Sequence, residues 1–167
     1  VRALQFPRAV LPIATTLRAF LLLLNSLVVM LPILVLSGEP VTWRWLMLVP
    51  VLALTSLFCL SVGFVTARIG ALIPDTTQVL PFVARVWTYA SGVMFNMQVF
   101  TAGHPGWIGT TLTLNPGYVY LTLARSTLLV GSPATTMNWV AGVLWAVVPL
   151  AASYLYFWRG EEGYGNV

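Results

Sequence analysis

The sequence has 167 residues, of which 59% are hydrophobic and 7% are charged, and its mean hydropathy is +0.89. Soluble domains carry roughly 25% charged residues, so this composition excludes a water-soluble protein and indicates an integral membrane protein. The net charge is +4 and all eight basic residues are arginine, a pattern that the orientation of membrane proteins explains without a nucleic-acid partner.

The absence of lysine excludes one class of enzyme. A P-loop that hydrolyses nucleotides needs a lysine on the phosphates, and the sequence has no such motif. Any ATP that drives this protein must therefore be hydrolysed by another polypeptide, and we expect no cofactor on this chain. The single cysteine, Cys59, also excludes an internal disulfide.

The first segment, residues 1–12, carries Arg2 and Arg8 among apolar residues, with Pro7 and Pro12 as helix breakers. It is too short and too charged to span a membrane. We predict a short interfacial segment, which its arginines place in the cytosol. The chain begins with Val1 rather than Met, and we expect that an N-terminal portion precedes it.

Two apolar spans follow, at about residues 15–36 and 43–67. Pro32 predicts a kink in the first span, and residues 37–40 (SGEP) predict a tight turn on the outer side. Trp43 and Trp45 are typical of an aromatic belt at the outer interface. We expect the second span to end at Arg68, before a short cytosolic elbow.

A third span is predicted at about residues 76–100, with Asp75 as its N-terminal cap. This span carries polar groups at membrane depth, where they are costly and face a protein interior or a water-filled passage. Two interpretations stay open: the groups line a transport route, or they hydrogen-bond to neighbouring helices. The groups are Arg85, Thr88, Tyr89, Ser91, Asn96 and Gln98.

Residues 101–138 lie on the outer side and are not a hydrophilic loop. A turn is expected at residues 104–107 (HPGW), and Asn115 and Pro116 predict a helix start, with Asn115 as the cap. We expect this helix to end at Gly131. About 15 residues of helix rise only about 22 Å, too short for a hydrocarbon core of about 30 Å. We therefore predict a re-entrant or interfacial element that gates the outer end of a passage.

The last span is predicted at about residues 139–158, before a cytosolic tail at residues 159–167. The sequence thus predicts an all-α integral membrane protein with four transmembrane helices and both ends inside. The sequence predicts no catalytic site, because His104 is alone and the four acidic residues are scattered. We expect no catalytic residue and no metal site.

The order of several segments resembles the permeases of ABC exporters that move bacterial cell-surface polysaccharides, such as O-antigen, teichoic acid and cell-wall galactan. The segments are residues 6–13 (FPRAVLPI), 68–75 (RIGALIPD), 86–95 (VWTYASGVMF), 114–116 (LNP) and 159–165 (RGEEGYG).

This resemblance implies the last four helices of a six-span permease, with a re-entrant pair of helices between the last two. It implies a homodimer in the bacterial cytoplasmic membrane, surrounded by membrane lipid and paired with two ATP-binding subunits that hold ATP and Mg. The cargo would be a polysaccharide on a polyprenyl diphosphate lipid. The all-arginine, valine- and alanine-rich composition favours a galactan.

The resemblance also implies roles for particular residues. A segment that couples to the ATPase would contain Arg2, Leu4, Phe6, Pro7 and Arg8. The channel lining would include the aromatic rings of Trp87, Tyr89 and Phe95, which could slide along sugar faces or could equally pack in the core. The outer gate would contain Trp107, Asn115, Pro116, Tyr118 and Arg125.

The sequence departs from the family pattern at the elbow, where Pro74 precedes Asp75 in place of a frequent basic residue. Two other functions stay open at this stage. One is a related ABC exporter for a small lipid or drug. The other is an intramembrane glycosyl or acyl transferase, which would need catalytic residues from outside this sequence.

Overall fold

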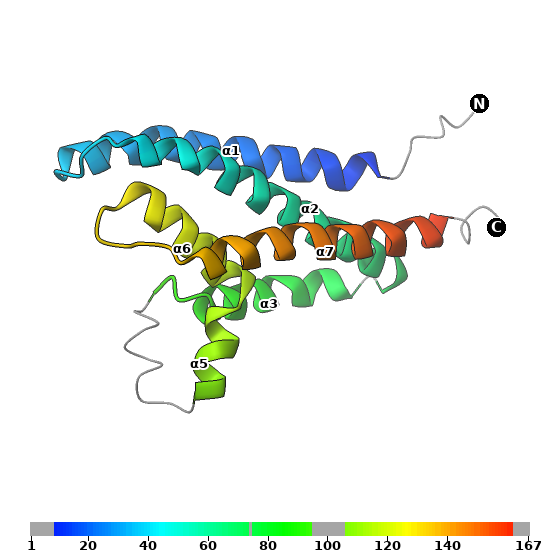
Figure 1. Cartoon of the computed structure of the whole chain (residues 1–167). Helices are drawn as coiled ribbons and strands as arrows, with labels where there is room; N and C mark the ends of the chain where they lie inside the picture. The colour runs from blue at the N-terminus through cyan, green and yellow to red at the C-terminus, as the bar shows by residue number, and fades with distance from the viewer. Residues whose placement is uncertain (1–8, 74, 95–105, 162–167) are drawn as a thin grey trace.

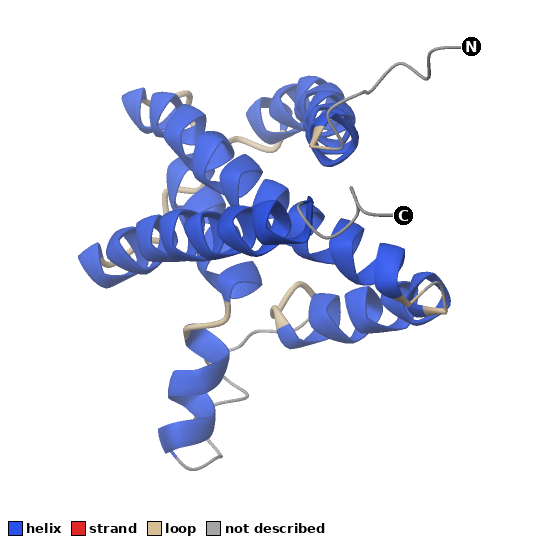
Figure 2. Ribbon diagram, turned by 90° about the vertical axis from the view of Figure 1, so that its right-hand side faces the viewer, coloured by secondary structure: helices blue, strands red, loops and turns tan. Residues whose placement is uncertain are grey.

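The structure, a computed structural model, describes residues 9–73, 75–94 and 106–161, and all of their regular structure is helical (Figures 1 and 2). Three helical stretches are long and apolar enough to cross a membrane: Val10–Leu36, Trp43–Leu72 and Thr136–Trp158. The predicted all-helical class is therefore confirmed over the described residues. The elements are α1 (Val10–Leu36), the 3-10 helix η1 (Trp43–Met47), α2 (Leu48–Leu72), α3 (Thr76–Ala90), α5 (Gly106–Thr113), α6 (Pro116–Leu128) and α7 (Thr136–Glu161).

Helix α1 begins at Val10, earlier than predicted, and Pro12 lies buried in its first turn. The prediction that Pro12 breaks the helix is wrong, because a first-turn residue needs no backbone N–H. The predicted turn after this helix is confirmed. Gly38 adopts a φ of 92°, its N–H donates to the Val35 carbonyl at 3.1 Å, and the Glu39 N–H donates to Leu34 at 3.2 Å. These two bonds form a Schellman motif.

Helix α2 continues to Leu72, so the predicted end of the second span at Arg68 is wrong. The predicted elbow was residues 69–74, which include Gly70, but a single glycine only weakens a helix. The stop signal is Pro74, because a residue before proline is driven out of the helical conformation. Ile73 accordingly has φ −134° and ψ 92°.

Helix α3 has 15 residues and ends at Ala90, so the prediction of one helix through residue 100 is wrong. The chain turns at Ser91 and at Gly92, which has a φ of 67°. Residues 95–100 lie outside the described part.

Asp75 occupies the N-cap position of α3 as predicted, but its side chain makes no capping hydrogen bond, because its own backbone is helical, with φ −64° and ψ −20°.

Helix α2 is the centre of the arrangement and packs against α1, α6 and α7. One end of the molecule, on the right in Figure 1, holds the start of α1, the connection between α2 and α3, and the end of α7. We call it the near end. The α1–η1 turn and the α6–α7 loop lie at the opposite end, on the left in Figure 1, which we call the far end. The Val130 N–H donates to Oε2 of Glu39 at 3.3 Å and joins these two connections.

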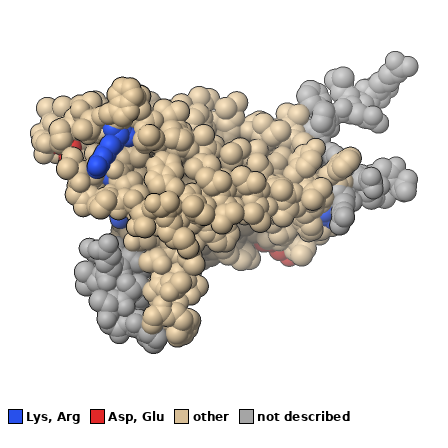
Figure 3. Space-filling model, in the orientation of Figure 1, with Lys and Arg blue, Asp and Glu red and all other residues tan. Residues whose placement is uncertain are grey.

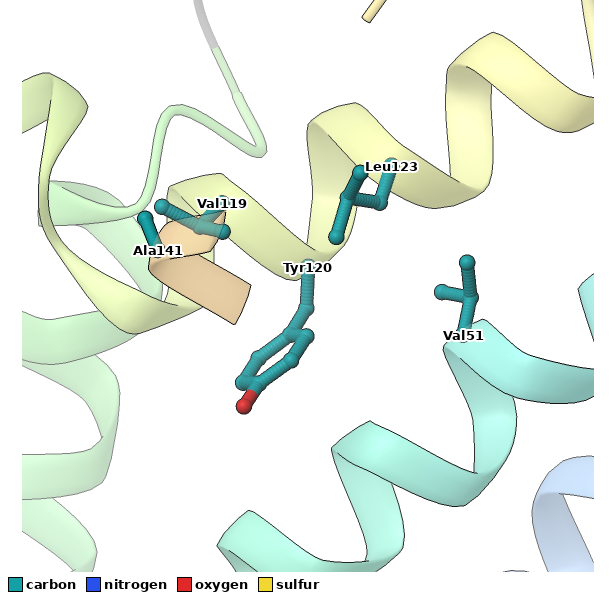
Figure 4. Close-up of a cluster of buried hydrophobic side chains, with 5 residues drawn as sticks. All are labelled: Val51, Val119, Tyr120, Leu123 and Ala141. Atoms are coloured by element: carbon teal, nitrogen blue, oxygen red, sulfur yellow. The ribbon is translucent and has the colours of Figure 1, made fainter. Parts of the chain in front are cut away.

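A small core surrounds α6, where Val119, Tyr120 and Leu123 meet Val51 of α2 and Ala141 of α7 (Figure 4). Inside it, the Tyr120 hydroxyl donates to the Gly142 carbonyl at 2.9 Å, so the phenol satisfies its donor without water. A Cβ on Gly142 would lie 2.9 Å from Cδ1 of Leu123, so the absence of a side chain lets α6 approach α7 closely.

On the face shown in Figure 3, the charged side chains lie towards the two ends of the molecule, and many large hydrophobic side chains of α1, α2 and α7 are exposed. None of the most apolar stretch of α1 is buried within the chain. An uncharged, apolar flank such as that of α1 is the surface that a bilayer requires.

Candidate functional site

Asn115 joins the end of α3 to the beginning of α6. Its Oδ1 accepts hydrogen bonds from Nε1 of Trp87 at 2.8 Å and from the Gly117 N–H at 3.1 Å. Its Nδ2 donates to the Ala90 carbonyl at 3.3 Å. One amide side chain therefore caps α6 and binds the last turn of α3; we call these four residues the α3–α6 junction.

Local sequence explains why the junction forms here. Asn115 is the N-cap of α6 and the buried Pro116 is its first residue, as predicted. At Gly117, an added Cβ would collide with Oγ of Ser91 and lie 2.8 Å from its Cβ. Only glycine allows α6 to start this close to the end of α3. The Ser91 hydroxyl is turned onto its own helix, where it donates to the Trp87 carbonyl at 2.7 Å.

The other end of α6 differs from the prediction. The helix ends at Leu128, and Leu129 leaves it with φ −108° and ψ 131°, so the prediction that Gly131 caps the helix is wrong. A helix that continues into extended backbone needs no glycine after it, because glycine is favoured only at positions with a left-handed backbone conformation. The helix is therefore 13 residues long and rises only about 20 Å.

An aromatic cluster packs against Trp87 of the α3–α6 junction. Phe58 of α2 contacts the rings of Trp87, Tyr120 and Trp145, with centroid distances of 5.8, 5.6 and 6.2 Å. Trp145 of α7 also donates its indole N–H to the Leu114 carbonyl at 2.8 Å. Four helices thus meet at one point, and edge-to-face contacts of this kind stabilise a packing beyond simple burial.

A pocket of about 540 Å³ opens beside this cluster. Its polar groups include the hydroxyls of Thr110 and Thr111, whose protons are donated to their own helix and whose lone pairs therefore remain free. A pocket with indole rings and hydroxyl acceptors suits a ligand with apolar faces and O–H donors. Its lining residues are Trp107, Thr110, Thr111, Leu114, Asn115 and Trp145.

Two of the predicted gate residues, Trp107 and Asn115, meet in this pocket. Trp107 belongs to α5, so the turn predicted at residues 104–107 is wrong at its second half, where Gly106 and Trp107 are helical. The remaining gate residues lie along α6: Pro116 is buried, and Tyr118 and Arg125 are partly exposed. Their role as a gate stays a prediction.

The residues predicted to line a channel separate into two groups. Trp87 and Ser91 face the protein interior and form hydrogen bonds there. Arg85, Thr88 and Tyr89 are exposed on the other side of α3, and Tyr89 is 58% exposed. The lining therefore stays a prediction for the exposed group. Other predicted residues lie outside the described part, namely Phe95, Asn96 and Gln98 and the coupling residues Arg2, Leu4, Phe6, Pro7 and Arg8.

Sequence reasoning missed Phe58, Trp145 and the threonines of α5. Trp145 did carry a usable signal, because an indole in the middle of an apolar span needs a partner for its N–H. Phe58 carried none, since a phenylalanine in an apolar helix is indistinguishable from its neighbours. Within the described ranges, no cluster of His, Cys, Asp or Glu could hold a metal ion.

Comparison with known proteins agrees with this architecture. The family model described as ABC-2 type transporter matches residues 2–129, which extend from before α1 to just after α6. Neither a curated protein nor a solved structure was found to match the chain. The membrane component of such a transporter lacks an ATPase of its own and pairs with ATP-binding subunits. The chain belongs to the ABC-2 type transporter family, as a multi-pass membrane permease.

Proposed function

We propose that this permease exports a polysaccharide linked to polyprenyl diphosphate across the bacterial cytoplasmic membrane. Two copies would form the transport path and would work with two ATP-binding subunits, in which ATP and Mg²⁺ bind. The observation that carries this proposal is that Asn115, which lines the pocket beside α5, is hydrogen-bonded to the last turn of α3, the helix that carries the exposed polar face. Both surfaces present aromatic rings together with polar groups.

The exposed face of α3 has the chemistry of a sugar path. Arg85, Thr88 and Tyr89 lie within little more than one helical turn, and the chain offers them no side-chain hydrogen-bond partner among its described residues. The hydroxyl of Thr88 donates to the Ala84 carbonyl, which leaves its lone pairs outward. A polar face at membrane depth needs a polar environment, and a second permease copy facing it would enclose one.

The pocket beside α5 suits the outer end of this path. The α3–α6 junction ties the pocket to the last turn of α3, so a polymer that leaves α3 would meet Trp107 and Trp145 next. In this arrangement α3 belongs to a fourth crossing of the membrane. Helices α5 and α6 form the outer re-entrant pair, with the near end of the molecule in the cytosol.

The apolar groove between α1 and α2 favours a second candidate cargo, a small lipid or drug. The groove has a volume of about 440 Å³, and almost all of its surface is apolar. It is the right kind of site for a hydrocarbon chain and a poor one for a sugar. The polysaccharide remains the better proposal because the groove contains none of the residues of the α3 face.

Reconstitution separates these cargos. The permease and its ATP-binding partner would be placed in proteoliposomes and offered polyprenyl diphosphate carrying a glycan, the same lipid without a glycan, or a fluorescent short-chain phospholipid. We expect ATP turnover and transfer across the bilayer to rise with the glycan-bearing lipid. If only the short-chain phospholipid raised ATP turnover and transfer, the cargo would be a small lipid or drug and not the glycan-bearing lipid.

A cellular measurement tests the same proposal independently. Depletion of the permease should lower the amount of polymer at the cell surface. Unchanged surface polymer, together with unchanged ATP turnover in membranes from the depleted cells, would contradict the export function.

A further inference from the structure

A stacked arginine stands at the near end of the molecule, away from the α3–α6 junction. The guanidinium carbon of Arg68, in the last two turns of α2, lies 3.7 Å from the centre of the Tyr156 ring on α7. Nε of Arg68 is buried and has no hydrogen-bond partner within the described ranges. The ring therefore holds a charged group whose donors are only partly used.

The stacking leaves the edge of the guanidinium unsatisfied. An aromatic ring attracts the flat face of the cation, but the five N–H donors point outward in the guanidinium plane. No described carboxylate forms an ion pair with Arg68. A partly buried cation without an anion is costly, so the unpaired edge of Arg68 is a place where a bound anion would be stabilised.

The depth of Arg68 identifies where that anion comes from. Arg68 follows Trp45 by 23 residues, or about 34 Å of helix, close to the thickness of a hydrocarbon core of about 30 Å. Trp43 and Trp45 suit one membrane interface, so Arg68 lies at the opposite one. Tyr154, Tyr156 and Trp158 of α7 are typical of the aromatic belt at the same level.

We propose that Arg68 and Tyr156 bind the phosphate group of a lipid at the near end. A guanidinium binds phosphate through two parallel N–H···O bonds, and the ring keeps the guanidinium plane fixed for that contact. Two lipids carry this chemistry: an anionic phospholipid of the membrane and the polyprenyl diphosphate of the cargo. The second source rests on the proposed function, and the first does not.

The test uses the complete transporter, permease with its ATP-binding partner, purified in a maltoside detergent that contains no phosphate. Phosphatidylglycerol, polyprenyl diphosphate or diacylglycerol is titrated in, and native mass spectrometry counts the lipids retained. We expect either phosphate lipid, but not the phosphate-free diacylglycerol, to be retained. Arg68→Gln should weaken this retention roughly tenfold, the size expected for a charge-assisted pair of hydrogen bonds.

Matched variants separate the site from a general effect of charge. Tyr156→Phe preserves the ring and should retain the lipid as the wild type does, whereas Tyr156→Leu should weaken retention although Arg68 is still present. Arg68→Lys should give intermediate retention, because lysine lacks the planar fork. Arg18→Gln removes an exposed arginine of α1 that stacks on no ring among the described residues, and it should change nothing.

Three results would overturn the proposal. One is wild-type retention by Arg68→Gln; another is equal loss in Arg18→Gln; the third is equal retention of diacylglycerol. If Arg68→Gln fails to assemble, Tyr156→Leu decides the matter, with its melting temperature compared to that of Tyr156→Phe. Retention of phosphatidylglycerol but not of polyprenyl diphosphate would support the site while leaving the cargo to be tested separately.

Discussion

Replacing Asn115 by alanine would test whether the α3–α6 junction holds the pocket in place. The substitution removes the acceptor for Trp87 and Gly117 and the donor for the Ala90 carbonyl. All three partners are only partly exposed, so water replaces the amide incompletely. Both α3 and α6 should therefore lose stability at the ends that meet.

The magnitude follows from the separate bonds. Loss of an N-cap asparagine costs about 1 kcal/mol, and an orphaned, partly buried indole N–H adds about 1 to 3 kcal/mol. We expect Asn115→Ala to lower the free energy of unfolding by about 2 to 4 kcal/mol in total. Asn115→Asp keeps both accepting contacts and favours the helix N-terminus, so it should cost only about 1 kcal/mol for the lost bond to Ala90.

The assay is reversible unfolding of the transporter in mixed micelles by a denaturing detergent, combined with a double-mutant cycle. Trp87→Phe removes the indole donor from the other side, and we expect a coupling energy with Asn115→Ala of about 1 kcal/mol. Asn138→Ala is the control, because that amide makes no side-chain hydrogen bond among the described residues. Additive effects of the Trp87 and Asn115 substitutions, or a loss no larger than the control's, would refute the junction.

Three further predictions follow from other contacts. Gly117→Ala should destabilise the transporter by about 1 to 3 kcal/mol, and adding Ser91→Gly, but not Ser91→Ala, should restore most of its melting temperature, because the obstacle includes the Ser91 Cβ. Tyr120→Phe should cost about 1 kcal/mol in the same unfolding assay, since its buried hydroxyl donates to a backbone carbonyl of α7 at 2.9 Å; an unchanged midpoint would contradict this. Arg85→Ala and Tyr89→Ala should each lower polymer export severalfold without changing the melting temperature, because both side chains are exposed; wild-type export by both variants would remove them from the transport path.

Local signals in the sequence were enough to predict several helix boundaries. Gly38 marked the end of α1, and Asn115 with Pro116 marked the start of α6, because each boundary depends on backbone chemistry within a few residues. Composition and span length were likewise enough for the all-helical membrane class. The end of α2 was predicted too early because the span was ended at the charged residue Arg68, whereas the helix continues to Leu72, close to Pro74.

Other features could not be derived from local patterns. Hydrophobicity continues past Ala90 to Phe100, so the span seemed to be one helix, while Ser91 and Gly92 end it. The contact between Trp87 and Asn115 joins residues 28 positions apart. No periodicity predicts such a pair, because it depends on how α3 and α6 meet in space.

Helix α6 is tied at both ends, and the two ties differ greatly in strength. Its start is held to α3 by two hydrogen bonds of one amide, at 2.8 and 3.3 Å, whereas the loop after its end is held by a single exposed bond of 3.3 Å to Glu39. Between these two ties the helix is held by packing, because Leu123, Thr127 and Leu128 are buried. The exposed bond to Glu39 is therefore the tie that water replaces most easily, and the connection between the α1–η1 turn and the α6–α7 loop should open before α6 itself leaves the core.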